Sequence, residues 1–212
     1  WIGGSSDDEI KSVAETSDGG YVAGGYFKSS SIELENGVTL NNKGISDGII
    51  IKYSEEGEIE WAKGIGGSSN DYITSIAEIS DGGIIAGGYF RSYSIELGKG
   101  VSLSNEGTED GMIIKYSSSG ECEWAKVIGG GRNDEITSVA ETSDGGIIAG
   151  GYFESISFDL GKGVILSNKG SYSRDGILIK YNAEGECEWA KGIGGSSDDY
   201  IKSVAETSDG GY

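Results

Sequence analysis

The chain consists of one segment that is repeated three times and then begun a fourth time. The tripeptide Ile-Gly-Gly starts at Ile2, Ile65, Ile128 and Ile193, so successive copies begin 63, 63 and 65 residues apart. The strings Ser-Asp-Gly-Gly and Ala-Gly-Gly-Tyr-Phe keep the same phase wherever they recur. A repeat of this length cannot bury its apolar face alone, so the copies are expected to stack on one another.

Each copy predicts four short strands. In the first copy, residues 9–16 alternate imperfectly and residues 58–63 strictly between apolar and polar side chains, which indicates strands with one buried face. Asp18-Gly19-Gly20 supplies the positive φ angles of a tight turn. Residues 21–27 follow as a strand whose paired glycines predict a close backbone approach or a β-bulge. Residues 48–53 are nearly all apolar, as expected of a strand buried on both faces.

Between the second and third strands lies an excursion of about twenty residues, 28–47 in the first copy. Residues 31–34 and 37–40 each alternate in polarity, which predicts an added β-hairpin. Its apolar side chains are expected to pack on the neighbouring copy. The third copy carries two extra residues within 170–176, and an insertion tolerated there indicates a surface loop.

Four antiparallel strands per repeat is the content of a β-propeller blade. The predicted fold class is therefore all-β, with about three blades plus part of a fourth. Residues 1–212 form a single repeat domain or a fragment of a larger propeller, divided into repeats 2–64, 65–127, 128–192 and 193–212, the last one partial.

Three motifs in a fixed order carry a family resemblance. They are Asp-Asp-x-Ile-x-Ser-Val-Ala-Glu-Thr-Ser-Asp-Gly-Gly-x-x-Ala-Gly-Gly-Tyr-Phe, then Asp-Gly-x-x-Ile-Lys-Tyr, then Gly-Glu-x-Glu-Trp-Ala-Lys-x-Ile-Gly-Gly. Across the whole chain they resemble the bacterial β-propeller repeats called seven-bladed or SBBP-type repeats. The resemblance implies four-stranded blades around a central axis, in proteins that are mostly exported or surface-attached and mostly without an assigned activity. Closed propellers have typically 4–8 blades, so closure by this chain alone is not expected.

Charge and composition exclude several functions. With 35 acidic and 16 basic side chains the formal net charge is −19, which disfavours nucleic acids and anionic membrane surfaces as partners. The chain has no His, so a His-dependent nucleophile and a His-bearing zinc site are excluded. The sequence contains no long apolar run and no signal-peptide pattern. Because an active site is asymmetric whereas these copies are nearly identical, we do not expect an enzyme.

Aspartates recur in the loop after the Trp-bearing strand and again just before the third strand. In a propeller these two loops emerge on the same face, where clustered carboxylates would suit Ca²⁺, the one cofactor that the sequence suggests. The alternative, which we favour because a repeated feature serves every blade, is that each Asp caps its own turn by accepting backbone N–H bonds. The candidates are Asp7, Asp8, Asp71, Asp134, Asp198 and Asp199 in the first loop and Asp47, Asp110 and Asp175 in the second.

The fourth strand of each copy carries a tryptophan, at Trp61, Trp124 and Trp189. These indoles are candidates for an aromatic platform that binds sugars. Large aromatic side chains in a small β repeat more often pack between blades, and we favour that role.

Cys122 and Cys187 stand where the first copy has Ile59. A cysteine that alternates with isoleucine behaves as a small buried apolar residue, and equivalent positions in adjacent copies are too far apart for a disulfide. We therefore expect two free thiols.

Three functional hypotheses follow. The first is a non-catalytic propeller scaffold or binding module, on the bacterial surface or secreted, with a protein or glycan ligand. The second is a lectin-like or Ca²⁺-dependent carbohydrate-binding module. The third is a structural protomer that joins other chains into a ring or filament by blade or strand pairing, since an open end exposes unpaired edges.

Overall fold

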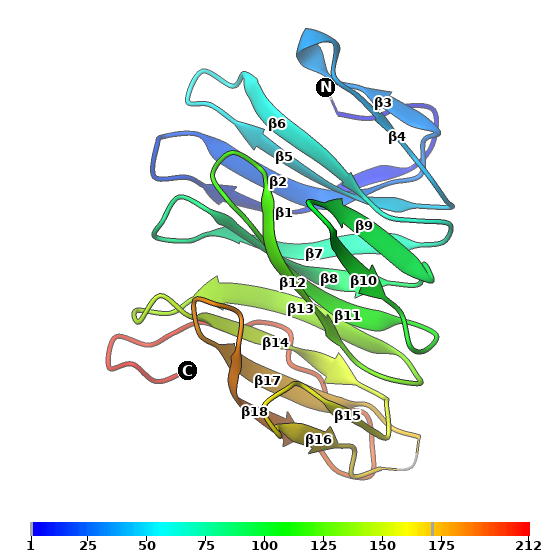
Figure 1. Cartoon of the computed structure of the whole chain (residues 1–212), viewed down its shortest axis with the longest axis vertical. Coiled ribbons are helices and arrows are strands. Elements are labelled where there is room, and N and C mark those ends of the chain that lie inside the picture. The colour runs from blue at the N-terminus through cyan, green and yellow to red at the C-terminus, as the bar shows by residue number, and fades with distance from the viewer. Residues whose placement is uncertain (1, 171) are drawn as a thin grey trace.

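Three four-stranded antiparallel sheets follow one another along the long axis of the molecule (Figure 1). The structure, a computed structural model, describes residues 2–170 and 172–212. Blade 1 contains β1 (Asp8–Glu15), β2 (Tyr21–Phe27), β5 (Asp47–Tyr53) and β6 (Ile59–Ile65). Blade 2 contains β7 (Asp71–Glu78), β8 (Ile84–Phe90), β11 (Asp110–Tyr116) and β12 (Cys122–Ile128). Blade 3 contains β13 (Asp134–Glu141), β14 (Ile147–Phe153), β17 (Asp175–Tyr181) and β18 (Cys187–Ile193).

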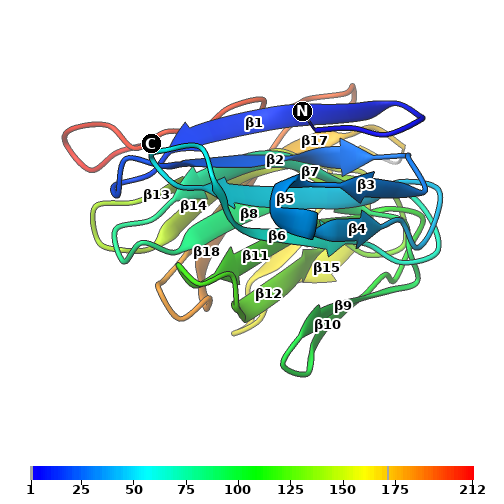
Figure 2. The same ribbon diagram turned by 90° about the horizontal axis from the view of Figure 1, so that it is seen from above.

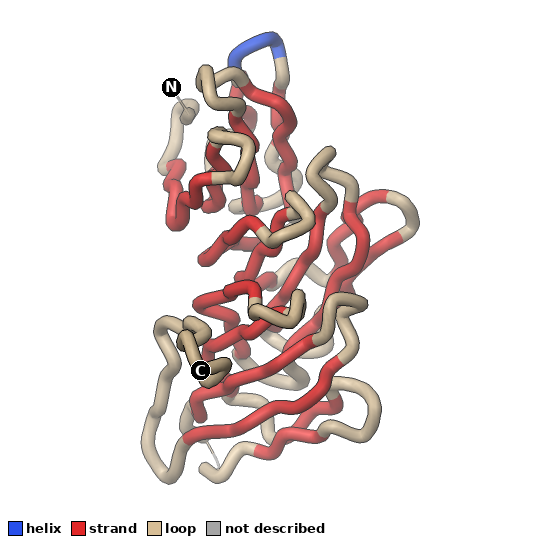
Figure 3. The backbone as a smooth tube through the Cα atoms, turned by 90° about the vertical axis from the view of Figure 1, so that its left-hand side faces the viewer, coloured by secondary structure: helices blue, strands red, loops and turns tan. Residues whose placement is uncertain are grey.

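The four predicted strands per copy are confirmed, with ends that shift by one or two residues, and so is the all-β blade architecture. The one helical element in the described part of the chain is the short 3-10 turn η1 (Glu35–Gly37), visible in Figure 3. No helix among the described residues is long and apolar enough to cross a membrane.

Strand order within a blade follows chain order from one edge to the other. The first strands, β1, β7 and β13, form what we call the inner edge, and β6, β12 and β18 lie at the opposite edge (Figure 2). Strand β7 contacts both β1 and β2 of the blade before it, and β13 contacts β7 and β8. The blades therefore stack most closely along the inner edge.

The paired glycines of the second strand serve two purposes at once. A Cβ on Gly24 would lie 2.9 Å from Cγ2 of Ile73, so this glycine admits the inner strand of the next blade. A Cβ on Gly25 would lie 1.9 Å from the carbonyl oxygen of Glu9, where the register of β1 against β2 shifts between Ile10 and Ser12. Both readings of the glycine pair, close approach and bulge, are therefore correct.

The predicted hairpins are present in all three copies. They comprise β3 (Ser31–Glu33) with β4 (Thr39–Asn41), β9 (Ser94–Gly98) with β10 (Val101–Ser104), and β15 (Ser157–Asp159) with β16 (Ile165–Ser167). Each lies mainly on the outer strand of its own blade, and β9 also touches β6 of the preceding one. The expectation that the hairpins pack on the neighbouring copy is thus incomplete, because Ile32 and Leu34 pack with Phe27 and Ile49 of their own blade.

Each blade also buries one lysine of its third strand, which sequence reasoning did not single out. Lys52, Lys115 and Lys180 are 3%, 8% and 2% exposed, so their aliphatic stems lie in the sheet interior. The Lys115 ammonium is 2.8 Å from a carboxylate oxygen of Asp81 and 3.0 Å from one of Glu123. The lysine therefore ties the turn after the first strand to the fourth strand of the same blade.

The partial fourth repeat is folded against blade 3. Residues 194–212, which we call the tail, run along this blade without forming a paired strand. The N–H of Ile201 donates to the carbonyl of Gly151 at 3.1 Å, and the N–H of Val204 donates to Oγ of Ser138 at 3.1 Å. The tail thus occupies the position that an inner strand of a fourth blade would have.

Candidate functional site

One aspartate of the loop before each blade accepts four hydrogen bonds, from its own loop and from the segment that follows the second strand of the same blade. Oδ1 of Asp71 accepts the N–H groups of Arg91 and Ser92, each at 3.1 Å. Its Oδ2 accepts the Gly67 N–H at 2.9 Å and the Ser92 hydroxyl at 2.6 Å. Asp8 and Asp134 make the corresponding four bonds. These are the bonds of a turn cap, and they leave few lone pairs for a cation.

The remaining members of this loop set lie nearer the surface. Asp7 forms an ion pair with Lys28 at 3.6 Å. Asp198 accepts the N–H of Arg174 at 3.0 Å, and Asp199 accepts the N–H of Gly195 at 3.1 Å.

The aspartates before the third strand are different, because one oxygen of each is buried without a hydrogen-bond partner. Oδ2 of Asp110 accepts the N–H of Glu106 at 2.7 Å, whereas Oδ1 is bare. A Cβ on Gly129 would lie 2.6 Å from this Oδ1 and 2.5 Å from Oδ2 of Asp134 in the next blade. Burial and the nearby Asp134 carboxylate raise the pKa of Asp110 to about 7. Asp47 and Asp175 have the same bare Oδ1.

The structure thus brings the two predicted aspartate sets together pairwise, at the junctions between blades. Among the described residues, no group of three or more His, Cys, Asp or Glu side chains is placed to hold a metal ion. Calcium binding stays a prediction of the sequence.

Two of the three tryptophans lie in the junctions between blades. The indole N–H of Trp61 donates to the carbonyl of Ser118 in blade 2 at 2.9 Å, and that of Trp124 donates to Ala183 in blade 3 at 3.3 Å. The third, Trp189, lies 5.7 Å from the ring of Tyr212, measured between centroids. All three indoles are partly buried, and each has its described partner in a different segment of the chain.

Cys122 and Cys187 are buried free thiols. Burial raises the pKa of the Cys122 thiol to about 11 and that of Cys187 in the same direction. At neutral pH both are protonated and unreactive, since the thiolate is the nucleophile.

A different surface emerges where the otherwise similar copies differ from one another, at one end of the inner edge. The tyrosine before Phe27 is the same in every blade, but its neighbours vary in charge and type. Four sets of equivalent positions vary from copy to copy. In chain order within each set, they are Glu9, Tyr72, Glu135 and Tyr200; Lys11, Thr74, Thr137 and Lys202; Lys28, Arg91 and Glu154; and Ser46, Glu109 and Arg174.

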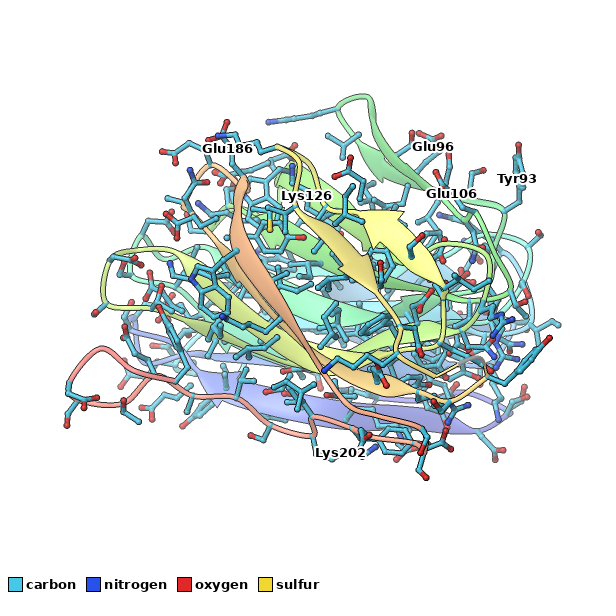
Figure 4. All side chains as sticks on the ribbon, turned by 90° about the horizontal axis from the view of Figure 1, so that it is seen from below. Tyr93, Glu96, Glu106, Lys126, Glu186 and Lys202 are labelled. Carbon is cyan, nitrogen blue, oxygen red and sulfur yellow. The ribbon has the colours of Figure 1, made fainter. Side chains whose placement is uncertain are left out.

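Tyrosine rings from adjacent blades meet at this end. Tyr26 and Tyr72 contact edge to face with centroids 4.5 Å apart, and Tyr72 stacks on Tyr89 at 4.9 Å. They border a pocket of about 350 Å³, which we call the tyrosine pocket, lined by Lys11, Tyr26, Tyr72, Thr74, Tyr89 and Glu135. Figure 4 shows Lys202 on this side of the molecule and Tyr93 and Glu96 on the opposite, hairpin side.

Most charged groups around the tyrosine pocket are held in place. The Tyr26 hydroxyl donates to Glu9 at 2.9 Å, which raises the pKa of Tyr26 to about 12. Arg91 forms an ion pair with Glu109 at 2.7 Å. Burial raises the pKa of Glu135, and the Glu109 carboxylate acts in the same direction, against the opposing hydrogen bond from Tyr152.

The tyrosine pocket was missed by the sequence reasoning, which looked for residues common to all copies. The signal that could have found it is the reverse: positions on the first strand that change between copies while the strand itself stays the same. Such a surface can stack, hydrogen-bond and pair charges with a ligand.

Comparisons with known proteins agree with the observed fold. No protein-family model matches the chain. It is 31% identical over 167 residues, 73% of its length, to an uncharacterised WD repeat-containing protein of Acanthamoeba polyphaga mimivirus. It is 30% identical over 115 residues, 53% of its length, to the regulatory protein FlaEY of Caulobacter vibrioides. The matched region is 12% of the length of each relative.

The similarity to a WD repeat-containing protein and the stacked four-stranded sheets lead to one conclusion. The chain is a β-propeller-like repeat protein.

Proposed function

We propose that this chain is a non-catalytic scaffold and binding module that takes a protein partner at the tyrosine pocket. The observation that carries the proposal is that three nearly identical blades diverge in charge and ring content where Tyr26, Tyr72 and Tyr89 come together. A repeat scaffold commonly keeps its packing positions constant and varies the residues of its binding face.

The chemistry of the pocket favours a protein ligand with basic side chains. Tyrosine and arginine are enriched in protein interfaces because they supply contact area and hydrogen bonds together. Glu135 offers a partly buried carboxylate beside the rings of Tyr72 and Tyr89, a setting that suits an ammonium or guanidinium group. The net charge of −19 would steer a basic partner toward the chain.

Two finer assignments belong to the same proposal. The three ordered motifs support membership of the SBBP-type bacterial repeats. That resemblance in turn supports a secreted or surface-attached location.

The test is selection from a random peptide library on the immobilised chain, followed by calorimetry of the enriched peptides. We expect basic peptides, binding that weakens as salt is added, and a loss of affinity of at least about tenfold in Tyr72→Ala and in Glu135→Gln. The matched control is Tyr93→Ala, which removes a tyrosine that is 81% exposed on the hairpin side. Peptides that bind Tyr72→Ala as well as they bind the unchanged chain would contradict the proposal.

A carbohydrate-binding module is the second candidate. It is favoured by the same pocket, because tyrosine rings beside Lys11, Thr74 and Glu135 are suited to stack on a sugar and bond its hydroxyls. A glycan array, repeated with and without Ca²⁺, separates this candidate from the first. Glycan binding that depends on Tyr72, in the absence of any peptide binding, would favour it.

A further inference from the structure

The tyrosine pocket is open at a place where other copies of the repeat carry a lysine. The second residue after the variable first-strand position is Lys11 in the first copy and Lys202 in the partial fourth copy, but Thr74 and Thr137 in the second and third. Thr74 lines the tyrosine pocket, and its hydroxyl is turned to the backbone, where it donates to the carbonyl of Ile136 at 2.5 Å. The pocket therefore lies where a long cationic side chain is replaced by a short one.

In the partial fourth copy this place is filled by an ammonium group of the chain itself. Nζ of Lys202 lies 4.6 Å from the centroid of the Tyr200 ring, a separation at which a cation is attracted to an aromatic face. The second copy has the same tyrosine, Tyr72, but Thr74 stands in the place of the lysine. Tyr72 lines the pocket, and its ring contacts are with two other tyrosines. The fourth copy is therefore a template for an ammonium bound at the second.

The first copy adds a carboxylate to this template. Nζ of Lys11 lies 5.5 Å from the centroid of the Tyr26 ring and 2.7 Å from a carboxylate oxygen of Glu9. The third copy has a glutamate at the same position, Glu135, which also lines the tyrosine pocket. It lacks a lysine of its own because Thr137 stands there. The pocket thus combines the ring and the carboxylate that hold an ammonium elsewhere in the chain.

The charge of Glu135 is only partly compensated by its neighbours. Burial raises the pKa of this carboxyl, and the Glu109 carboxylate acts in the same direction. A hydrogen bond from Tyr152 and the more distant charges of Lys202 and Arg174 oppose this effect without cancelling it. A cation that enters the pocket would supply the missing compensation.

We propose that the tyrosine pocket binds a lysine side chain of the partner, with its ammonium between the ring of Tyr72 and the carboxylate of Glu135. The partner's lysine takes the place that Thr74 leaves open and that Lys202 fills in the fourth copy. This inference rests on the protein-binding function proposed above and narrows the ligand from a basic protein to a lysine side chain.

The arginines at this end of the molecule lie in other places. Arg91 forms its ion pair with Glu109, and the guanidinium of Arg174 lies 4.7 Å from the centroid of the Tyr152 ring. Both come from loops beside the second and third strands, whereas the first strand carries only lysine or threonine at the position of Thr74. An ammonium is a compact point charge, but a guanidinium needs a planar partner for its fork of donors. We therefore expect the pocket to prefer lysine to arginine.

The first experiment compares three blocked pentapeptides that differ only in the central residue, which is lysine, arginine or Nε-acetyl-lysine. Nuclear magnetic resonance titration of the unchanged chain measures the binding of each peptide and shows whether the ring of Tyr72 responds. We expect the lysine peptide to bind at least about fivefold more tightly than the arginine peptide and at least about tenfold more tightly than the uncharged acetylated peptide. The comparison needs no variant, so it does not depend on the folding of a mutant.

The outcomes separate this inference from the function on which it rests. Equal or tighter binding of the arginine peptide, still dependent on Tyr72, overturns the lysine assignment and leaves the protein-binding function in place. Methylammonium that binds as tightly as the lysine peptide overturns the assignment in favour of a small-amine site. If none of the three peptides binds, the lysine assignment fails. If the peptide library also yields no Tyr72-dependent sequence, the proposed function fails with it.

The second experiment gives the pocket an ammonium from the chain itself. Thr74→Lys copies the arrangement of Tyr200 and Lys202 into the second repeat, and Lys11 shows that a lysine at this position is compatible with a following blade. The introduced ammonium should weaken binding of the lysine peptide at least about tenfold, because it occupies the pocket and neutralises Glu135. It should also lower the pKa of Glu135 in the absence of peptide, which a titration followed by nuclear magnetic resonance measures.

The matched control is Tyr93→Lys, which adds the same charge at a position that is 81% exposed on the hairpin side. It should bind the lysine peptide as the unchanged chain does and leave the pKa of Glu135 unaltered. Circular dichroism checks that both variants keep their β structure. Unweakened binding of the lysine peptide by Thr74→Lys, or an unshifted pKa of Glu135 in that variant, contradicts the proposal.

Discussion

At the scale of single residues, the same side chain has opposite electrostatics in two positions of the repeat. Asp81 is half-exposed beside the Lys115 ammonium, and this hydrogen bond lowers the pKa of its carboxyl. Asp110 is fully buried with one bare oxygen, and its pKa is raised to about 7. The difference comes from the partner and from solvent, since an isolated buried charge loses its hydration.

The first prediction concerns Asp110→Asn. The folded pKa of Asp110, about 7, lies above the ordinary value of 3.8, so its stabilising effect is present below pH 3.8 and is lost as the pH rises through about 7. The amide carries no charge at any pH in this range and so avoids this loss. We expect the variant to gain on the order of 2–4 kcal/mol relative to the unchanged chain between pH 4 and pH 8.

Urea unfolding across that pH range measures the gain. The control, Asp81→Asn, should behave in the opposite sense: it removes a carboxyl whose folded pKa is lowered, so the variant loses stability above the ordinary pKa of 3.8 rather than gaining it. A pH-independent difference between Asp110→Asn and the unchanged chain would show that this carboxyl is ionised throughout.

At the scale of elements, the Gly-Gly pair sets how a blade is built and how closely the next one approaches. A Cβ on Gly88 would lie 2.0 Å from the carbonyl oxygen of Tyr72, inside the same sheet. A Cβ on Gly87 would lie 2.8 Å from Cγ2 of Ile136 and 2.8 Å from Cγ1 of Val139, in the next blade. The backbone beside Gly88 cannot move away from an added Cβ without breaking strand pairing, whereas the side-chain ends beside Gly87 can shift.

The second prediction follows from that contrast. Gly87→Ala should cost about 1–3 kcal/mol, as overpacking does, and Gly88→Ala should cost more because β7 must lose its bulge. In a double-mutant cycle with Val139→Ala, Gly87→Ala should show favourable coupling and Gly88→Ala none. Chemical denaturation of the three single and two double variants measures both quantities, and equal coupling for the two glycines would contradict the assignment.

At the scale of the whole molecule, stability is distributed along the stack. Buried residues of blades 1 and 2 form one cluster and residues of blades 2 and 3 another, so each blade is held by its neighbours rather than by one central core. Repeat proteins of this kind unfold according to the strength of individual junctions.

The third prediction tests this with Trp124→Ala. Its indole is partly buried between blades 2 and 3, so we expect a loss of about 2 kcal/mol, less than for a fully buried tryptophan. Hydrogen exchange should accelerate in β11, β17 and the tail but much less in β2 and β5. Uniform acceleration throughout the chain would instead indicate a single cooperative unit.

The strands, turns and blades of this protein could be predicted because the residues that cause them are close together in the sequence and recur in three copies. Alternation in residues 58–63, the turn at Asp18 and the Gly24-Gly25 pair act within one sheet or on the strand beside it, and repetition removes chance matches. The roles of Lys115 and of the Tyr72 ring were not accessible in this way. Both depend on groups that are distant in sequence, Asp81 in one case and Tyr26 in the other.

The repeat, the four-stranded unit and the need for units to stack follow from the amino-acid pattern alone, because periodic polarity and paired glycines allow few other arrangements. Which groups meet at each junction depends on the three-dimensional packing. The structure shows Trp61 and Trp124 covered by the next blade and the variable tyrosines gathered in one pocket. Exposure depends on which neighbour is present, and repeats that read alike in sequence differ in what lies beside them.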